Sequence, residues 1–333
     1  MSDEKIPDPK AIREAEEAGL VFSEDKKTLL ECRNKMIKEA VIPDGVTEIG
    51  ERAFWGCSAL TGVHIPDGVT EIGESAFCGC SALTSVNIPD GVTEIGKEAF
   101  AMCYNLTDIN IPDSVTEIGM WAFAGCTSLT DVKIPDSVTV IENGAFYGCS
   151  ALTGIKIPDG VTVIEWRAFA GCTSLTGVHI PDGVTEIGDG AFTGVKSVKS
   201  DNADFSVDDF GVLVDVKRKK LLYVPPSLSN YSIPDGVTEI GWCAFSGCSA
   251  LTRVIIPDSV TVIERWAFEG CTSLTGIKIP DGVTEIGYKA FSGCSALADV
   301  KIPDGVTKIG ADAFAGAGCE EQVKRDYPRL FGE

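Results

Sequence analysis

Residues 60–82 read L-T-G-V-H-I-P-D-G-V-T-E-I-G-E-S-A-F-C-G-C-S-A, and close copies of this stretch recur along most of the chain. The prolines of the copies mark the period, because successive prolines lie 23 residues apart within two blocks. They are Pro43, Pro66, Pro89, Pro112, Pro135, Pro158 and Pro181 in the first block and Pro234, Pro257, Pro280 and Pro303 in the second. A fixed period of this length predicts an array of stacked supersecondary units.

The apolar positions inside one copy indicate how it folds. Leu60, Val63 and Ile65 are spaced as in a short strand that turns its apolar side chains to one side. Val69 and Ile72 supply further inward side chains, and the Ala-Phe pair and the second cysteine of the copy add more. A single copy cannot bury these groups alone, but stacked copies form a continuous core in which each contacts mainly its neighbours. The sequence therefore predicts a solenoid.

The Pro66-Asp67-Gly68 segment is typical of a turn, since proline presets φ, aspartate can accept from a nearby amide, and glycine tolerates positive φ. In other copies serine replaces the glycine, at Ser114, Ser137 and Ser259. Serine adopts positive φ only at a cost, so we expect these turns to keep φ negative.

The repeated I-P-D-G-V-T-E-I-G, A-F and G-C-S-A-L-T segments, with the Leu60, Val63 and Ile65 spacing, resemble the BspA-like leucine-rich repeat family over roughly residues 42 to 317. The resemblance implies an α/β repeat fold. This is a curved, right-handed leucine-rich repeat solenoid with a parallel β-sheet face and short helical or 3-10 turns. Members of this family are often surface or secreted bacterial proteins that adhere to host or matrix proteins.

The array is interrupted between Pro181 and Pro234. Residues 211–216 and 220–224 flank a basic tip and predict a β-hairpin, and residues 19–22 and 28–30 predict a similar hairpin near the N-terminus. Helices are expected over about 10–18 and 320–327. The predicted organisation is an N-terminal cap over 1–41, a first repeat block over 42–194, an irregular coil with a hairpin insertion over 195–232, a second block over 233–317 and a C-terminal cap helix over 318–333.

Composition excludes several classes of function. Acidic residues outnumber basic ones 49 to 28, and the formal charge of −21 argues against nucleic-acid binding. No apolar run is long enough to span a membrane, so no membrane insertion is expected. The first residues lack the basic flank and apolar stretch of a secretion signal, which favours a cytoplasmic location, while the family resemblance favours the cell surface or secretion.

Nine of the thirteen cysteines occupy one repeat position and should form a ladder of small buried thiols along the core. A metal or redox array is the alternative, but zinc sites need paired spacings and convergent ligands that the sequence lacks. Four other thiols lie at variable positions or near the ends and are the expected reactive ones. They are Cys32, Cys78, Cys243 and Cys319.

Carboxylates form a second ladder, with an aspartate at each of the eleven Ile-Pro-Asp turns. Like charges stacked about 5 Å apart repel, so either each aspartate is held by the amides of its own turn or cations such as calcium bridge the row. No nucleophile, base and acid have a plausible meeting point, so no enzyme activity, resident metal or cofactor is expected.

Positions that vary from copy to copy are the candidates for partner binding. One is the outward position between the Val and Ile of the strand, neutral to basic in an acidic chain: His64, Asn87, Asn110, Lys133, Lys156, His179, Ile255, Lys278 and Lys301. The other is the pair before each Ala-Phe, which holds Trp121, Trp166, Trp242 and Trp266. Lysines could simply keep the sheet soluble and tryptophans could pack between coils, but both kinds of position also suit recognition of a protein.

The sequence therefore predicts a non-enzymatic scaffold that recognises a protein partner through its sheet face or its aromatic edge. A secreted or surface adhesin and a self-assembling structural protein are the alternatives. The oligomeric state is open, with a monomer expected.

Overall fold

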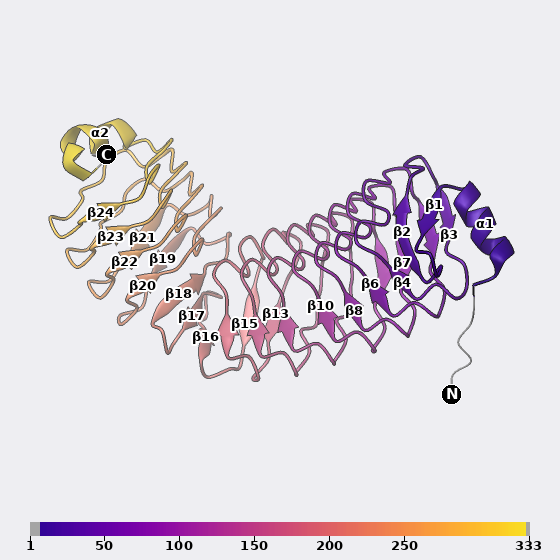
Figure 1. The fold of residues 1–333 in the computed structure, drawn as a ribbon. Coiled ribbons are helices and arrows are strands. Elements are labelled where there is room, and N and C mark those ends of the chain that lie inside the picture. The colour runs from indigo at the N-terminus through magenta and orange to yellow at the C-terminus, as the bar shows by residue number, and fades with distance from the viewer. Residues whose placement is uncertain (1–6, 331–333) are drawn as a thin grey trace. The chain divides into compact units, whose positions relative to one another are not determined.

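The computed structural model describes residues 7–330; residues 1–6 and 331–333 of the predicted end caps lie outside the described part. The chain forms two compact units, one ending at Ala191 and the other beginning at Phe192. Each unit is a stack of solenoid coils (Figure 1). The solenoid fold and its parallel sheets agree with the sequence prediction.

The first unit begins with the predicted helix and hairpin. Helix α1 covers Pro9–Glu17, and the side chain of Asp8 accepts from the backbone N–H of Lys10 as its N-cap (3.1 Å). Strands β1 (Leu20–Phe22) and β2 (Thr28–Cys32) form the antiparallel hairpin. Strand β2 then pairs in parallel with the first coil, so the hairpin covers that end of the stack.

Each later coil of this unit adds one two-residue strand at the Glu-Ile or Val-Ile segment. The first sheet has the order β1-β2-β4-β6-β8-β10, and a second has the order β11-β12-β14. Their strands are β4 (Glu48–Ile49), β6 (Glu71–Ile72), β8 (Glu94–Ile95), β10 (Glu117–Ile118), β11 (Val140–Ile141), β12 (Val163–Ile164) and β14 (Glu186–Ile187).

The expected sheet at the Leu, Val and Ile spacing is shorter than predicted. Pairs form there between β3 (Glu39–Val41) and β5 (Gly62–His64) and between β7 (Ser85–Asn87) and β9 (Asp108–Asn110), and β13 covers Val178–Ile180. Residues 131–134 and 154–157 occupy the same position without strand pairing. The longer ladder lies at the Glu-Ile and Val-Ile segments, and the glycine that follows in most coils lies close to the backbone of the preceding coil. A Cβ on Gly73 would lie 2.9 Å from Glu51 N.

The second unit repeats this plan. Its sheet has the order β16-β17-β18-β20-β22-β23-β24, and β19 pairs with β21 on the other side. The predicted hairpin is β17 with β18, but β16 adds a third antiparallel strand that the sequence prediction lacked. The strands are β15 (Val198–Ser200), β16 (Phe205–Val207), β17 (Leu213–Asp215), β18 (Lys220–Tyr223), β19 (Asn230–Ser232), β20 (Glu239–Ile240), β21 (Arg253–Ile255), β22 (Val262–Ile263), β23 (Glu285–Ile286) and β24 (Lys308–Ile309).

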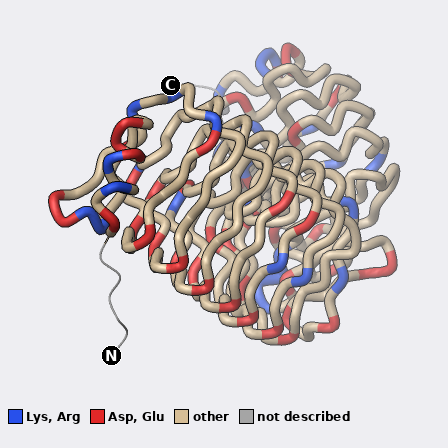
Figure 2. Tube along the Cα trace, turned by 90° about the vertical axis from the view of Figure 1, so that its right-hand side faces the viewer, with Lys and Arg blue, Asp and Glu red and all other residues tan. Residues whose placement is uncertain are grey.

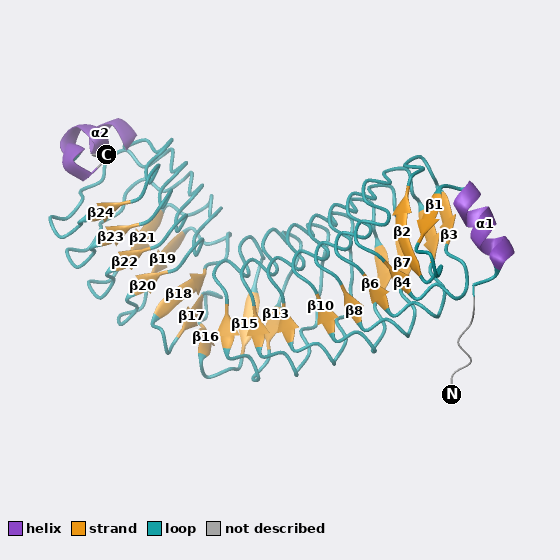
Figure 3. Cartoon of the chain, in the orientation of Figure 1, coloured by secondary structure: helices purple, strands orange, loops and turns teal. Residues whose placement is uncertain are grey.

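Helices are confined to the ends of the described chain (Figure 3). Helix α2 covers Glu320–Asp326 and is followed by a 3-10 turn at Pro328–Leu330. Within the coils, the expected helical turns remain single turns, closed by hydrogen bonds such as Cys57 N–H to Phe54 O (3.0 Å). Val323 of α2 is buried against the last coils.

The core of each unit is a column of stacked rings. The centroids of Phe54 and Phe77 lie 5.1 Å apart and those of Phe268 and Phe291 also 5.1 Å, with nearly parallel planes. Every phenylalanine of the column is buried, because the Ala-Phe segment turns it into the coil. Stacked rings at this spacing add about 0.5–1.5 kcal/mol per pair beyond burial of their area.

The Pro-Asp turns keep negative φ where serine replaces glycine, as predicted. Ser114, Ser137 and Ser259 are absent from the positive-φ residues. Each of their hydroxyls donates to a valine carbonyl of the preceding coil, as Ser114 does to Val92 O at 2.6 Å. The serine thus adds a bond between coils that glycine cannot supply.

Candidate binding surface

The variable outward strand positions, called here the strand row, are exposed in both units. In the first unit the row contains His64, Asn87, Asn110, Lys133, Lys156 and His179. In the second unit it contains Ile255, Lys278 and Lys301. Strand alternation produces this placement, since Val and Ile on either side turn into the core.

Some side chains of the strand row form hydrogen bonds or ion pairs within the described part of the molecule, and others do not. Asn110 donates to the Asn87 side chain (3.3 Å), and Lys133 forms an ion pair with Asp113 (2.7 Å). The hydrogen bond and charge of Asp113 raise the pKa of Lys133. Lys156, Lys278 and Lys301 form no ion pair with any residue in 7–330. These three ammonium groups remain available to an acidic partner.

The variable pair before each Ala-Phe, called here the edge pair, packs between coils. In the first unit the Trp121 ring meets Trp166 edge to face at 5.9 Å. In the second unit Trp242 stacks on Trp266 at 5.1 Å, and Trp266 meets Tyr288 at the same distance. These rings are half-buried, so the edge pair stabilises contacts between coils.

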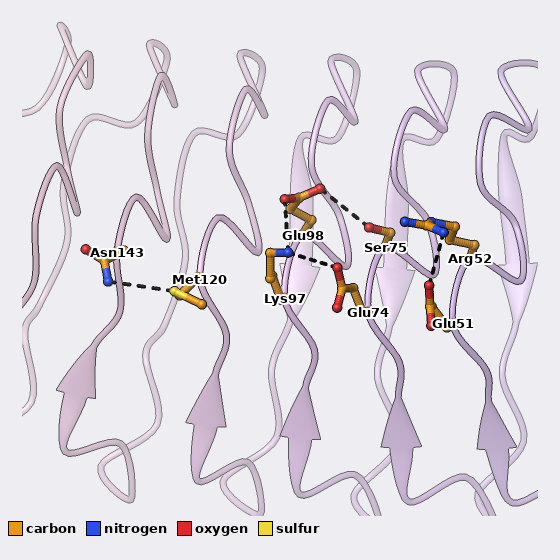
Figure 4. A network of polar contacts seen from close by, with 8 residues as sticks. All are labelled: Glu51, Arg52, Glu74, Ser75, Lys97, Glu98, Met120 and Asn143. Atoms are coloured by element: carbon orange, nitrogen blue, oxygen red, sulfur yellow. Dashed lines mark hydrogen bonds and ion pairs between the residues drawn. The ribbon is translucent and has the colours of Figure 1, made fainter.

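Polar edge pairs behave in the same way. Lys97 contacts Glu74 of the preceding coil (2.9 Å) and Glu98 (3.8 Å), while Glu98 accepts from Ser75 (Figure 4). Many of the variable side chains at these positions thus contact other side chains of the same molecule. Trp55, which follows an Ala-Phe, differs because its side chain is 53% exposed.

Acidic residues recur coil after coil along an edge of the stack (Figure 2). The expectation that turn amides hold the aspartates is wrong for most turns: Asp67, Asp90 and Asp136, for example, accept no hydrogen bond from any residue in 7–330. The turns close instead through the backbone, as Val69 N–H donates to Pro66 O (3.1 Å). These carboxylates are exposed, so water and dissolved ions screen their repulsion.

A denser acidic ladder lies at the Glu-Ile strands of the first unit. The register places Glu71 beside Glu94 and Glu94 beside Glu117. Partial burial, followed by the charges of Glu117 and Glu71, raises the pKa of Glu94. In the second unit the corresponding ladder is neutralised, since Lys220 pairs with Glu239 and Lys308 with Glu285, each at 2.6 Å.

The nine ladder cysteines are buried, as predicted. Most of these thiols donate to a phenylalanine carbonyl, as Cys80 does to Phe54 O (3.2 Å). Burial raises the pKa of Cys80, Cys172 and Cys248 to about 12. The ladder is therefore unreactive packing at neutral pH.

The four thiols predicted to be the reactive ones are all buried, and this burial argues against that prediction. Cys78 and Cys243 are only 3% and 6% exposed, because neighbouring coils close over them, and Cys32 and Cys319 are fully buried at the ends of the core. Burial raises the pKa of Cys78. Burial also raises the pKa of Cys319, to about 11. Cys32 departs in the other direction, since a hydrogen bond from Cys57 lowers its pKa to about 7.

The side chains able to bind a metal ion are distributed over different coils in the part of the chain that the structure describes. No group of three or more His, Cys, Asp and Glu side chains within 7–330 could hold a metal ion. His64 and His179 lie in different coils of the strand row. Within the same range, no helix is long and apolar enough to cross a membrane.

Sequence reasoning missed an apolar hollow in the second unit. Phe210 and Ile255 are 61% and 50% exposed and line a depression of about 360 Å³ together with Tyr231 and Arg253. Ile255 was recognised as an outward position, but Phe210 lies in an irregular loop outside the repeat pattern. The only signal in the sequence was an aromatic residue in an acidic turn, Asp208-Asp209-Phe210-Gly211.

Comparison with known proteins places this geometry in a family. The model of the BspA type leucine-rich repeat region matches residues 31–153, 93–211 and 218–324. A leucine-rich cell surface protein of Faecalibacterium prausnitzii is 37% identical, with a TM-score of 0.79 over 89% of this chain and 84% of that one. A leucine-rich repeat protein of Bacteroides ovatus is 33% identical, with a TM-score of 0.56 over 93% and 88%. Among curated protein sequences none matches.

The fold and the exposed variable rows define a leucine-rich repeat scaffold. The chain belongs to the BspA type leucine-rich repeat family.

Proposed function

We propose that this chain is a non-enzymatic scaffold that binds a protein partner through its strand row. One observation carries the proposal: the row is exposed and varies from coil to coil, whereas the edge pair is used in packing between coils. Variable groups on a rigid repeated backbone offer an extended recognition surface. Spread-out polar groups do not assemble a reaction centre, which supports a binding role over catalysis.

The proposed place of action is the cell surface. The Faecalibacterium protein, which covers most of this chain, is a cell surface protein. A buried thiol ladder tolerates an oxidising exterior, because inaccessible thiols with raised pKa react slowly. Host or matrix proteins are then the proposed class of partner.

A capture experiment tests this function. The wild-type chain and a Lys133→Ser, Lys156→Ser, Lys278→Ser, Lys301→Ser variant would be immobilised and exposed to extracellular matrix or host-surface protein, and separately to a bacterial lysate. We expect a partner from the first material, lost by the variant. A variant with substitutions only at exposed Ile-Pro-Asp aspartates, Asp67→Ser and Asp281→Ser, is the matched control and should retain it. Capture that is equal for all three proteins would contradict the proposal.

A further inference from the structure

The second unit has an apolar hollow bordered by exposed side chains. The ladder of β19 and β21 sets Asn230 beside Arg253 and Ser232 beside Ile255. Phe210 approaches from the loop between β16 and β17, and its ring meets Tyr231 edge to face at 6.0 Å. Two large apolar side chains therefore border one depression of about 360 Å³. Exposed apolar groups gathered in a concavity are a property of binding sites.

The loop that presents Phe210 is held in place. Oδ1 of Asp208 accepts from the backbone N–H of Phe210 (2.9 Å) and of Val212 (3.0 Å). Oδ2 of the same carboxylate accepts from the Tyr231 hydroxyl (2.8 Å). One aspartate thus fixes both the loop and the ring against which Phe210 rests. A preorganised hollow loses little entropy when it is filled.

Three basic side chains near this hollow form no ion pair within the described chain, although Asp235 and Asp258 also line the neighbouring depression. A second depression of about 520 Å³ shares Arg253 and Ile255 with the first and extends to Lys278, and Lys301 follows in the next coil of the row. Arg253, Lys278 and Lys301 form no ion pair with any residue between 7 and 330. Elsewhere in this unit Lys220 and Lys308 are paired at 2.6 Å. The free cations complement a negatively charged ligand.

We propose that this face of the second unit binds an extended acidic segment of a partner protein through one large apolar anchor side chain. The inference rests on the proposed binding function and names the partner chemistry. The anchor fills the hollow between Phe210 and Ile255, and flanking carboxylates meet Lys278 and Lys301. Coils repeat about every 5 Å and same-side residues of an extended chain about every 7 Å, so acids within about four residues of the anchor reach both lysines. Asp235 and Asp258 line the same depression as Lys278, so the carboxylates of the segment have to lie beside the lysines and away from these two side chains.

Selection of random peptides tests the proposal without a known partner. Displayed twelve-residue random peptides would be selected for binding to the immobilised full-length chain. The selected peptides would then be tested for binding to a Phe210→Ser, Ile255→Ser variant, and those that bind it would be discarded. We expect peptides that bind only the wild type and that carry one large apolar residue with at least two Asp or Glu residues within four positions. Failure to select any peptide dependent on Phe210 and Ile255, or enrichment of basic peptides, would overturn it. The substituted residues are exposed, so the variant keeps its fold.

Affinity measurements on one selected peptide separate the two kinds of contact. Ile255→Ser should weaken binding about tenfold or more, and the Lys278→Ser, Lys301→Ser pair about tenfold at low salt with a smaller effect in 1 M salt, where charges are screened. Lys10→Ser, on helix α1 outside the strand row, removes an equally exposed charge and is the control that should change nothing. Equal weakening by Lys10→Ser would refute the site. If peptides fail but a captured protein still depends on the strand row, this inference falls and the proposed function stands.

Discussion

At the scale of single residues, the position before each Ala-Phe has left-handed backbone. The residues there are Arg52, Ser75, Glu98, Trp121, Gly144, Arg167, Gly190, Cys243, Trp266, Lys289 and Asp312, and all have positive φ. Only two are glycine, although an L-residue pays about 1–2 kcal/mol in this conformation. The sequence pattern did not reveal this, because the position varies freely and only the turn geometry imposes its φ.

Replacing a strained residue by glycine should stabilise the protein. Arg52→Gly relieves the strain at φ 59° and loses only an ion pair with Glu51, whose two side chains are each 61% exposed. We expect a gain of about 0.5–1 kcal/mol after the larger chain entropy of glycine is counted. The measurement is the midpoint of urea unfolding. Arg52→Ala keeps the strain and loses the ion pair, and a midpoint as high as that of Arg52→Gly would show that strain is not the cause.

The thiol ladder should make stability fall at alkaline pH. The pKa of Cys80, Cys172 and Cys248 is raised in the folded protein to about 12, whereas an unfolded thiol titrates near 9. Their stabilising contribution is therefore complete below about pH 9 and is lost as pH rises toward 12, by about 1.4 kcal/mol per pH unit for each thiol. Unfolding free energies at pH 8, 9 and 10 check this. In Cys172→Ala the free energy of unfolding should fall less steeply with pH than in the wild type. An equally steep fall would show that the buried thiols are not the cause of the pH dependence.

At the scale of elements, the burial and packing of the variable side chains depend on contacts between coils, which the sequence pattern of a single coil does not contain. The solenoid, its turns and its inward phenylalanines follow from periodicity, so the repeat predicted them, whereas the longer strand ladder lies at the Glu-Ile segments and not at the predicted position. The burial of Cys78 and Cys243, the packing of Trp121 against Trp166 and the third strand β16 depend on which side chain occupies the neighbouring coil or on an irregular segment. Such contacts have no signature within one copy.

Gly144 shows how one coil accommodates its neighbour. It lies between the coils of Trp121 and Trp166, and a Cβ there would collide with the Trp121 ring. Gly144→Ala should destabilise the first unit by about 2–4 kcal/mol through left-handed strain and overpacking. Gly56→Ala also places alanine at positive φ but in open space, and should cost only about 1–2 kcal/mol. Equal losses in thermal unfolding of the two variants would contradict the role of the tryptophan contact.

At the scale of the whole molecule, each unit begins its ladder with a hairpin. Strand β2 pairs with β4, and β18 pairs in the same way with β20. A hairpin in this position shields the open end of a stack from aggregation. The sequence revealed the two hairpins by their similar spacing, but not the three-stranded form of the second.

The second unit should therefore fold alone. A fragment covering 192–333 is expected to unfold cooperatively and to remain monomeric in light scattering, because it retains its hairpin. A fragment covering 233–333 lacks that hairpin and should aggregate or unfold at a lower temperature. If both fragments behave alike, the hairpin is not the element that closes the stack.

The most direct test of the binding surface is hydrogen exchange with a captured partner bound. The scaffold account predicts slower exchange in the strands that carry the strand row, above all β21 at Arg253–Ile255 together with the loop around Phe210. Exchange at the edge pairs and the Ile-Pro-Asp turns should stay unchanged. Protection confined to the edge pairs or the turns, with the strand row unaffected, would contradict the account.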